Sequence, residues 1–377
     1  METEVDEPTN ENRDKFVQNM LGATKMLKSS EASKNIINHI INCTTAVLLL
    51  AMTKCDILSN PNPESFHRNI LEIFQYVDVL NAQVPENYVI KFPTGTLYLS
   101  SYTPEKLSEA VLGSDLEGHV VLPHISAFQS HVENATCVSF QLAVFFWNVH
   151  PSDENITGSI FNVILTHKSS EIKLANLSDM IELYFPRPNA SPQETNRSFL
   201  LEKDKKALTT LNISDPNMTV FFDVKPSSNV SLLLCLAHGS PPDPTTCRNT
   251  TILSHIDGYR WMITPEMLDQ TAGTWYIDTR LSNSNEMSGI KLKITSFMTK
   301  CMYWNTDSER WSTDGCWVGI KTTPNLTQCL CNHLTMFGTS FFVLPNYVDI
   351  SRTAELFATV TQNYVVLALL CAFFGST

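Results

Sequence analysis

The stretch that decides the fold is CMYWNTDSERWSTDGCWVGIKTTPNLTQCLCNHLTMFGTSFFVLP, which covers residues 301–345. A His-Leu-Thr tripeptide at residues 333–335 follows its last cysteine, and an apolar run from Phe337 to Leu344 comes next. Four cysteines and three tryptophans precede the tripeptide: Cys301, Trp304, Trp311, Cys316, Trp317, Cys329 and Cys331. This concentration of cysteine and tryptophan indicates a small framework held by metal or by disulfides.

Three interpretations of this framework compete. In the first, Cys329, Cys331 and His333 bind zinc with Cys316 or Cys301 as a fourth ligand, although the spacing is unusual for a zinc finger. In the second, two disulfides form a purely structural knot and contribute about 2–4 kcal/mol each. In the third, the same two bridges hold the His-Leu-Thr tripeptide in position for chemistry.

The chemistry available to the tripeptide is cleavage of its own backbone. The Thr335 hydroxyl is a weak nucleophile, but the His333 imidazole can accept its proton near neutral pH. The oxygen would then attack the carbonyl of Leu334 and form an ester, which water hydrolyses. Attack in so small a ring needs a strained peptide, and bridges at Cys329 and Cys331 would maintain that strain.

N-glycosylation motifs indicate the compartment. The chain has 29 Asn and 71 Ser and Thr residues, so random placement would give about five Asn-x-Ser/Thr motifs. Eleven are present, and nine of them lie between residues 134 and 249. The candidate glycosylation sites are Asn42, Asn134, Asn155, Asn176, Asn189, Asn196, Asn212, Asn217, Asn229, Asn249 and Asn325. This excess favours the secretory pathway, where cysteines are oxidised, and it argues against zinc.

Composition narrows the function classes further. Hydrophobic residues make up 43% of the 377 residues, which is enough for a folded core. The net charge is −12 without a cluster of Lys and Arg, so we expect no nucleic-acid partner. Neither GxGxxG nor GxxxxGK[ST] occurs, and we expect no cofactor and no metal.

The two ends predict a piece of a larger membrane protein or a short isoform. Residues 1–15 are polar and acidic, without the apolar core of a signal peptide, and we expect a disordered tail there. Residues 364–375 are nearly all apolar, but a spanning helix needs about 20 such residues. We therefore expect residues 364–377 to begin a truncated transmembrane helix; a short core helix is the alternative.

Between these ends the hydrophobic pattern changes once. From residue 16 to 84, apolar residues recur at three- and four-residue spacings, which predicts three or more packed helices. From residue 85 to 345, short β-prone segments alternate with turn residues, which predicts a β-sandwich. The expected strands include residues 88–92, 138–149, 219–224, 231–235, 273–278 and 290–295.

The remaining cysteines fall into three groups. Cys235 and Cys247 flank a hairpin-like loop and are expected to form a disulfide. Cys43 and Cys55 bridge only if the helix that separates them ends between them, so their pairing stays open. Cys137 and Cys371 are expected to be free.

The framework at residues 301–345 resembles the GPS motif that ends a GAIN domain. The motif has a first Cys followed by an aromatic residue and Trp, a second Trp, Gly-Cys, and Cys-x-Cys-x-His-Leu-Thr/Ser-x-Phe. The matching segments are Cys301-Met-Tyr-Trp304, Trp311, Gly315-Cys316 and Cys329-Leu-Cys-Asn-His-Leu-Thr-Met-Phe337. The match covers about 37 residues and every marked position.

The resemblance implies an α+β fold in which a helical subdomain precedes a GAIN-type antiparallel β-sandwich. It also implies self-cleavage between Leu334 and Thr335 and disulfides Cys301–Cys329 and Cys316–Cys331. The expected organisation is a tail (1–15), a helical subdomain (16–84), a sandwich (85–345), a juxtamembrane linker (346–363) and the start of a membrane helix (364–377).

Two receptor classes carry this domain before their first membrane helix, namely polycystin-1-like proteins and adhesion G-protein-coupled receptors. Residues 337–346, 261–268 and 273–276 look like the polycystin-1-like group, which is therefore preferred. That resemblance implies a cell-membrane receptor or cation-channel subunit with this region outside the cell. It also implies a polycystin-2-type channel partner, bound through regions absent from this chain, and an unidentified extracellular ligand. An uncleaved structural stalk is the alternative function.

Overall fold

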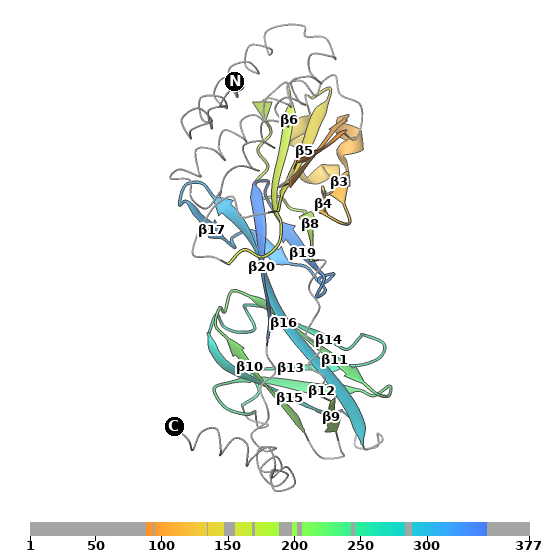
Figure 1. Cartoon of the computed structure of the whole chain (residues 1–377), viewed down its shortest axis with the longest axis vertical. Helices are drawn as coiled ribbons and strands as arrows, with labels where there is room; N and C mark the ends of the chain where they lie inside the picture. Colours follow the sequence, from red (N-terminus) through yellow and green to blue (C-terminus); the bar gives the residue numbers. More distant parts are fainter. Residues whose placement is uncertain are drawn as a thin grey trace, which may run out of the picture. The chain divides into compact units, whose positions relative to one another are not determined.

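A computed structural model describes residues 88–92, 95–133, 135–146, 155–167, 170–187, 198–201, 206–242, 246–282 and 289–344 (Figure 1). The expected tail, helical subdomain, linker and membrane helix lie outside these residues, as do Cys43, Cys55 and Cys371. In the described part, no helix is long and apolar enough to cross a membrane. All the neighbouring strands described below run antiparallel to each other.

The described residues belong to two compact units, which are considered separately. Unit 1 takes its described residues from 88–187 and 300–340, and unit 2 takes them from 198–299 and 341–344. Two strands, β16 (Ile290–Asn305) and β20 (Met336–Val343), contribute residues to both units. The described strands of residues 85–345 therefore fall in both units, and unit 1 is built from two separate stretches of the sequence.

Unit 1 contains two sheets. The first has the order β1-β2-β5-β6-β20, with β7 on β6 and β17 on the end of β16; the second has the order β18-β19-β8-β4-β3. Their bounds are β1 (Tyr88–Phe92), β2 (Gly95–Tyr102), β5 (Val138–Phe145), β6 (Ile160–His167), β7 (Ser170–Glu171), β17 (Arg310–Ser312), β18 (Cys316–Val318), β19 (Leu326–Cys331), β8 (Ile181–Pro186), β4 (Gly118–Val121) and β3 (Val111–Ser114). Short helices η2 (Pro104–Leu107), η3 (Ile125–Ala127) and α4 (Gln129–Val132) connect the early strands.

Aromatic packing joins the two sheets of unit 1. Phe161 of β6 stacks on Phe185 of β8 with ring centroids 4.0 Å apart, and both side chains are buried. Gly118 of β4 has a φ of +112°, and a Cβ there would lie 2.1 Å from the Phe161 ring. Only glycine allows this close approach, because it has no side chain and tolerates positive φ.

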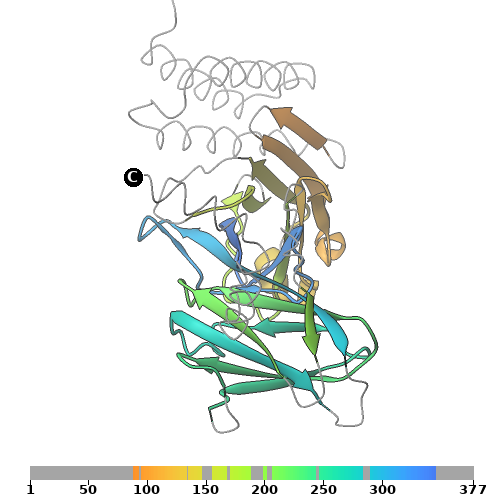
Figure 2. The same cartoon turned by 60° about the horizontal axis from the view of Figure 1, so that its bottom comes forward.

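Unit 2 is a second two-layered arrangement with its own core (Figure 2). One layer has the order β10-β15-β12-β13, and the other contains β14, β11, β16 and β9. Their bounds are β10 (Ala207–Ile213), β15 (Gly273–Leu281), β12 (Leu232–His238), β13 (Asn249–Leu253), β11 (Thr219–Pro226), β14 (Arg260–Ile263) and β9 (Ser198–Leu201). Trp275 is fully buried in this core and donates its indole N–H to the carbonyl of Thr271 at 3.1 Å.

The expected strands agree with the structure in position. For example, the segment expected at residues 88–92 is β1, and the segment expected at 219–224 lies within β11 (Thr219–Pro226). A strand that was not among those expected, β10, alternates strictly between inward and outward residues along its seven positions. The antiparallel β architecture is thus confirmed for the described residues.

Candidate cleavage site in unit 1

The strands around the His-Leu-Thr tripeptide are fixed by two disulfides. Cys301 of β16 is bonded to Cys329 of β19, and Cys316 of β18 is bonded to Cys331 of β19. Their Cα atoms lie 5.7 Å and 4.2 Å apart, and Cys316 and Cys331 also face each other in the β18–β19 register. This is the pairing that the GPS resemblance implies.

The loop before β19 is held by a buried arginine. Arg187 donates to the carbonyls of Pro324 at 3.0 Å and Thr323 at 2.7 Å, and also to the hydroxyl of Thr327. Its backbone N–H donates to the carbonyl of Asn325 at 2.7 Å. The strand that delivers Cys329 and Cys331 therefore starts from a fixed position.

Backbone hydrogen bonds hold Asn332, Leu334 and Thr335. The Asn332 N–H donates to the carbonyl of Gly315 at 2.9 Å, and the Leu334 N–H donates to that of Leu174 at 3.0 Å. The carbonyl of Asn332 accepts from Leu177 at 2.9 Å, and the carbonyl of Thr335 accepts from Val163 at 3.2 Å. The segment between β19 and β20 is therefore a fixed bend.

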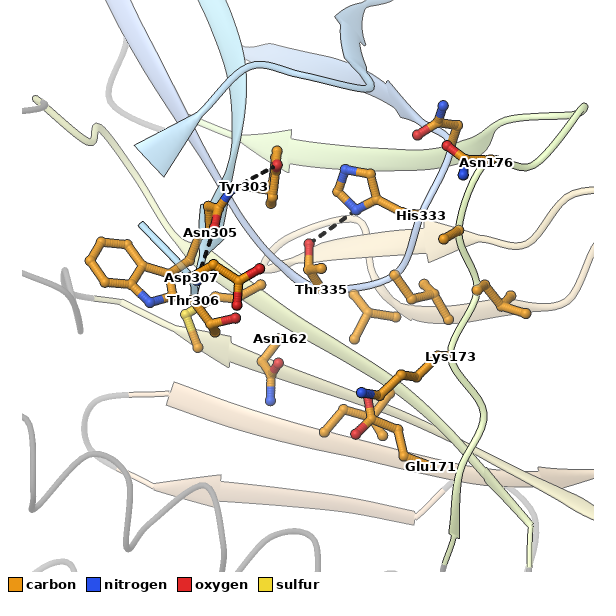
Figure 3. Close-up of a pocket in the computed structure, with 18 of the residues that line it drawn as sticks. Asn162, Glu171, Lys173, Asn176, Tyr303, Asn305, Thr306, Asp307, His333 and Thr335 are labelled. Carbon is orange, nitrogen blue, oxygen red and sulfur yellow. Dashed lines mark hydrogen bonds between the residues drawn. The ribbon is translucent and has the colours of Figure 1, made fainter. Parts of the chain in front are cut away.

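His333 and Thr335 face each other inside this bend. The Nδ1 atom of His333 lies 3.3 Å from the Oγ1 atom of Thr335, and Figure 3 shows the two groups directed toward one another. On the other side of the ring, Nε2 lies 3.4 Å from the carbonyl oxygen of Asp314. A carbonyl can only accept, so this contact requires the proton on Nε2 and leaves Nδ1 as the acceptor for the threonine hydroxyl.

The surroundings of His333 favour its neutral form. Tyr303 packs edge-on at 4.4 Å between centroids, and Phe337 stacks on the ring at 5.6 Å. Burial lowers the pKa of His333 from its usual 6.5, and the hydrogen bond to the Asp314 carbonyl opposes this effect in part. Neutral imidazole is the form that accepts a proton, so His333 is suited to act as a base at neutral pH.

A cavity of about 730 Å³ opens beside the bend. His333, Leu334 and Thr335 line it together with residues from β6, β16 and the segment after β7 (Figure 3). Its polar lining includes Asn162, Glu171, Lys173, Asn176, Tyr303, Asn305, Thr306, Asp307 and Glu309. Solvent can therefore reach the Leu334–Thr335 peptide.

Zinc does not fit this arrangement. All four cysteines of the framework are in disulfides, so none offers a thiolate. Among the described residues, no group of three or more His, Cys, Asp and Glu side chains could hold a metal ion.

The other cysteines and tryptophans have varied positions. Cys235 and Cys247 form a disulfide in unit 2, whereas Cys137 in unit 1 is exposed and unbonded. Trp311 is buried and lies edge-on to Trp304 at 5.7 Å. Trp317 is 46% exposed and is not part of the core.

The described glycosylation motifs lie mostly at the surface. Six of their asparagines are exposed, namely Asn155, Asn176, Asn212, Asn217, Asn229 and Asn325. Asn249 is half-buried and donates its side-chain amide to the carbonyl of Met267 at 3.2 Å. Asn42, Asn134, Asn189 and Asn196 lie outside the described residues.

The backbone groups that position His333 and Thr335 were not among the residues expected from the sequence. The Asp314 carbonyl fixes the tautomer of His333, and the Asp314-Gly315 dipeptide is a turn signal that could have indicated it. The segment from Leu174 to Leu177 carries no comparable signal, because it contributes backbone groups from about 160 residues away in the sequence.

Comparison with known proteins identifies this region. A protein-family model described as GPS: GAIN subdomain B matches residues 276–340. This region is therefore similar to GAIN subdomain B. The GAIN match covers the whole of β16, both framework disulfides and the His333–Thr335 bend.

Longer similarity connects the chain with polycystins. Polycystin-1-like protein 3 of Mus musculus is 30% identical over 296 residues, which are 75% of this chain and 14% of that protein. Polycystin-1 of Homo sapiens is 32% identical over 114 residues, 30% of this chain and 2% of that protein. Adhesion G-protein coupled receptor G6 of Danio rerio is 41% identical over 61 residues, 15% of this chain and 5% of that protein. The resemblance to the polycystin-1-like family is confirmed, and the chain spans about a seventh of the length of Polycystin-1-like protein 3.

Proposed function

We propose that this chain is the extracellular GAIN region of a polycystin-1-like membrane protein and that it cuts itself once. The cut falls between Leu334 and Thr335, and the two fragments stay associated. The observation that supports this proposal is the 3.3 Å approach of His333 Nδ1 to Thr335 Oγ1 in a bend fixed on both sides.

The first step is a shift of the acyl group from nitrogen to oxygen. His333 Nδ1 accepts the hydroxyl proton of Thr335, and Oγ1 attacks the carbonyl carbon of Leu334. The bond from this carbon to the Thr335 nitrogen then breaks, and the nitrogen receives the proton from His333. The product is an ester between Leu334 and the Thr335 side chain, with a free amine on Thr335.

The second step is hydrolysis of the ester. Water from the cavity beside the bend attacks the same carbonyl carbon, and the bond to Oγ1 breaks. The chain then ends in a carboxylate at Leu334, and a new N-terminus begins at Thr335. Oγ1 takes a proton from the water, so the Thr335 hydroxyl is restored, but the Leu334–Thr335 peptide bond is consumed. Each chain therefore reacts once, and no turnover is expected.

Burial and pairing of β20 keep the fragments together. Phe337, Thr339 and Ser340 are at most 1% exposed, and Phe337 pairs with Phe161 of β6. The N–H of Thr157 donates to the Thr339 carbonyl at 2.8 Å, and the Thr339 hydroxyl donates to the Thr157 carbonyl at 3.1 Å. None of these contacts depends on an intact bond at residue 334.

The relatives support the proposed setting. A polycystin-1-like identity supports a place at the cell membrane with the glycosylated region outside, which the exposed asparagines favour. A polycystin-2-type channel subunit would be bound through regions absent from this chain. Cleavage would let a ligand or a mechanical load separate the fragments.

The experiment compares wild type with Thr335→Ala, Thr335→Ser and Thr335→Cys. Each full chain is secreted from mammalian cells behind a supplied signal peptide, deglycosylated and separated under denaturing conditions. Wild type and Thr335→Ser should give two fragments, and Thr335→Ala should stay intact. Thr335→Cys should accumulate a thioester that hydroxylamine cleaves at Leu334. Intact, disulfide-bonded wild type would instead support an uncleaved structural stalk.

A further inference from the structure

The cleavage bend is also held by a segment far from the GPS motif in sequence. The segment Leu174–Leu177 accepts a hydrogen bond from the Leu334 N–H through Leu174 and donates one to the Asn332 carbonyl through Leu177. These two bonds lie on either side of His333. The spacing between Leu174 and Leu177 therefore determines where the imidazole stands relative to Thr335.

One residue sets that spacing. Asn176 has a φ of +55°, in the left-handed region, and its side chain is exposed at the rim of the cavity (Figure 3). Leu174 and Leu177 are buried, at 2% and 5% exposure, so side-chain packing anchors both ends of the segment. Asparagine adopts the left-handed conformation more readily than most residues with a side chain, whereas a β-branched residue strongly resists it.

We propose that Asn176 is a positioning residue for the cut and that its left-handed backbone aligns the two hydrogen bonds that hold His333. This inference rests on the proposed self-cleavage. It gives a role in the reaction to a residue that contacts neither the nucleophile nor the peptide that breaks. Without the left-handed turn, Leu174 and Leu177 cannot both keep their bonds to residues 332–334.

Asn176 is also the asparagine of a glycosylation motif, because Ser178 follows two positions later. A change at Asn176 therefore alters the backbone preference and removes the motif at the same time. Two variants separate these effects. Asn176→Gly keeps the left-handed conformation and removes the motif, whereas Ser178→Ala removes the motif and leaves Asn176 unchanged.

A matched control is available in unit 2. Gln270 is exposed and has a φ of +50°, so Gln270→Val imposes the same backbone penalty as Asn176→Val at a residue without a bond to the bend. All variants are made in the full chain with wild type and Thr335→Ala beside them. Pulse-chase labelling gives the cleavage rate of each, and the melting temperature and disulfide content of the secreted protein report its folding.

Asn176→Val should slow cleavage about tenfold, which corresponds to the cost of forcing such a residue into the left-handed region. Asn176→Gly, Ser178→Ala and Gln270→Val should each cleave within about twofold of wild type. Equal cleavage in Asn176→Val and Gln270→Val would overturn the inference while leaving self-cleavage intact. Slow cleavage in Ser178→Ala and Asn176→Gly would assign the effect to the glycan and also overturn it. An intact wild type would overturn the proposed function and this inference with it.

Discussion

The Nδ1 atom of His333 lies 3.3 Å from the Oγ1 atom of Thr335, and the opposite nitrogen of the ring lies 3.4 Å from the Asp314 carbonyl oxygen. When Nε2 donates its proton to the Asp314 carbonyl, Nδ1 keeps a lone pair that can accept the proton of the Thr335 hydroxyl. A base and a hydroxyl two residues apart therefore meet in the protonation state that the proposed cut requires. The expected consequences can be tested separately.

The pH dependence of cleavage should report the pKa of His333. Burial lowers this pKa below its usual 6.5, so the base is neutral at pH 7 and gains its proton only in more acidic solution. In precursor purified at acidic pH and then transferred, the rate should be level above about pH 6.5 and fall about tenfold per unit below the pKa. Quenched time courses on denaturing gels give the rate at each pH. A midpoint above pH 7 would contradict the assignment of His333 as the base.

The same shift affects stability. Since the folded-state pKa is lower than the unfolded one, the unfolded chain binds the proton more readily. The stability of unit 1 should therefore fall as the pH drops below about 6.5 and stop falling, for this group, below the folded-state pKa. Urea unfolding of wild type and His333→Gln across this range measures the effect. If the difference in unfolding free energy between wild type and His333→Gln stayed constant with pH, His333 would have the same pKa in the folded and unfolded states.

Replacement of Gly315 by alanine should impair cleavage. Gly315 has a φ of +71°, and an added Cβ would lie 2.5 Å from Asn332 Oδ1 and 3.1 Å from His333 Cδ2. The turn must shift, and the Asp314 carbonyl and the imidazole shift with it, so we expect at least about a tenfold lower rate. Asp314→Asn is the matched control, because His333 contacts the backbone and not the side chain of this residue. Normal cleavage in Gly315→Ala would show that the tautomer contact is unimportant.

The framework disulfides should matter for cleavage, and the third disulfide should not. Joint replacement of Cys316 and Cys331 by serine removes the bridge next to the bend and should cost about 2–5 kcal/mol of unfolding free energy. The cleaved fraction of the secreted protein should drop sharply. Joint replacement of Cys235 and Cys247 removes a bridge of unit 2 and should leave the cleaved fraction unchanged. Equal losses in both variants would indicate a general folding defect.

Association of the fragments should depend on the buried face of β20. Phe337 is 1% exposed, whereas Phe342 on the same strand is 38% exposed. In protein that is already cleaved, Phe337→Ala should weaken the complex by about 3–5 kcal/mol and let the fragments separate at lower urea concentration. Phe342→Ala should change the separation midpoint little. Size-exclusion chromatography in increasing urea measures both, and identical midpoints would place the main contacts elsewhere.

The sequence predicts the parts of this site that depend on side-chain type. His333, Thr335 and the cysteines are recognisable from their spacing, and short β-prone segments between turn residues predict strands such as β1 and β11. The sequence does not predict that residues 88–187 and 300–340 belong to the same unit. Strands of both units have the same two-residue side-chain period, so the pattern cannot assign a strand to one unit or the other. Nor does it predict Leu174 at the bend, since this residue acts through a backbone carbonyl that every residue possesses.

The N-terminal sequence of the C-terminal fragment would show directly whether the chain is cut between Leu334 and Thr335. The full chain is secreted from mammalian cells with a C-terminal tag, and the tagged material is deglycosylated, denatured, reduced and subjected to Edman degradation. Cleavage between Leu334 and Thr335 predicts a single new sequence that begins Thr335-Met-Phe-Gly. It also predicts a partner fragment whose mass corresponds to a C-terminus at Leu334. An intact tagged chain with both framework disulfides formed, or a fragment that begins at another residue, would contradict it.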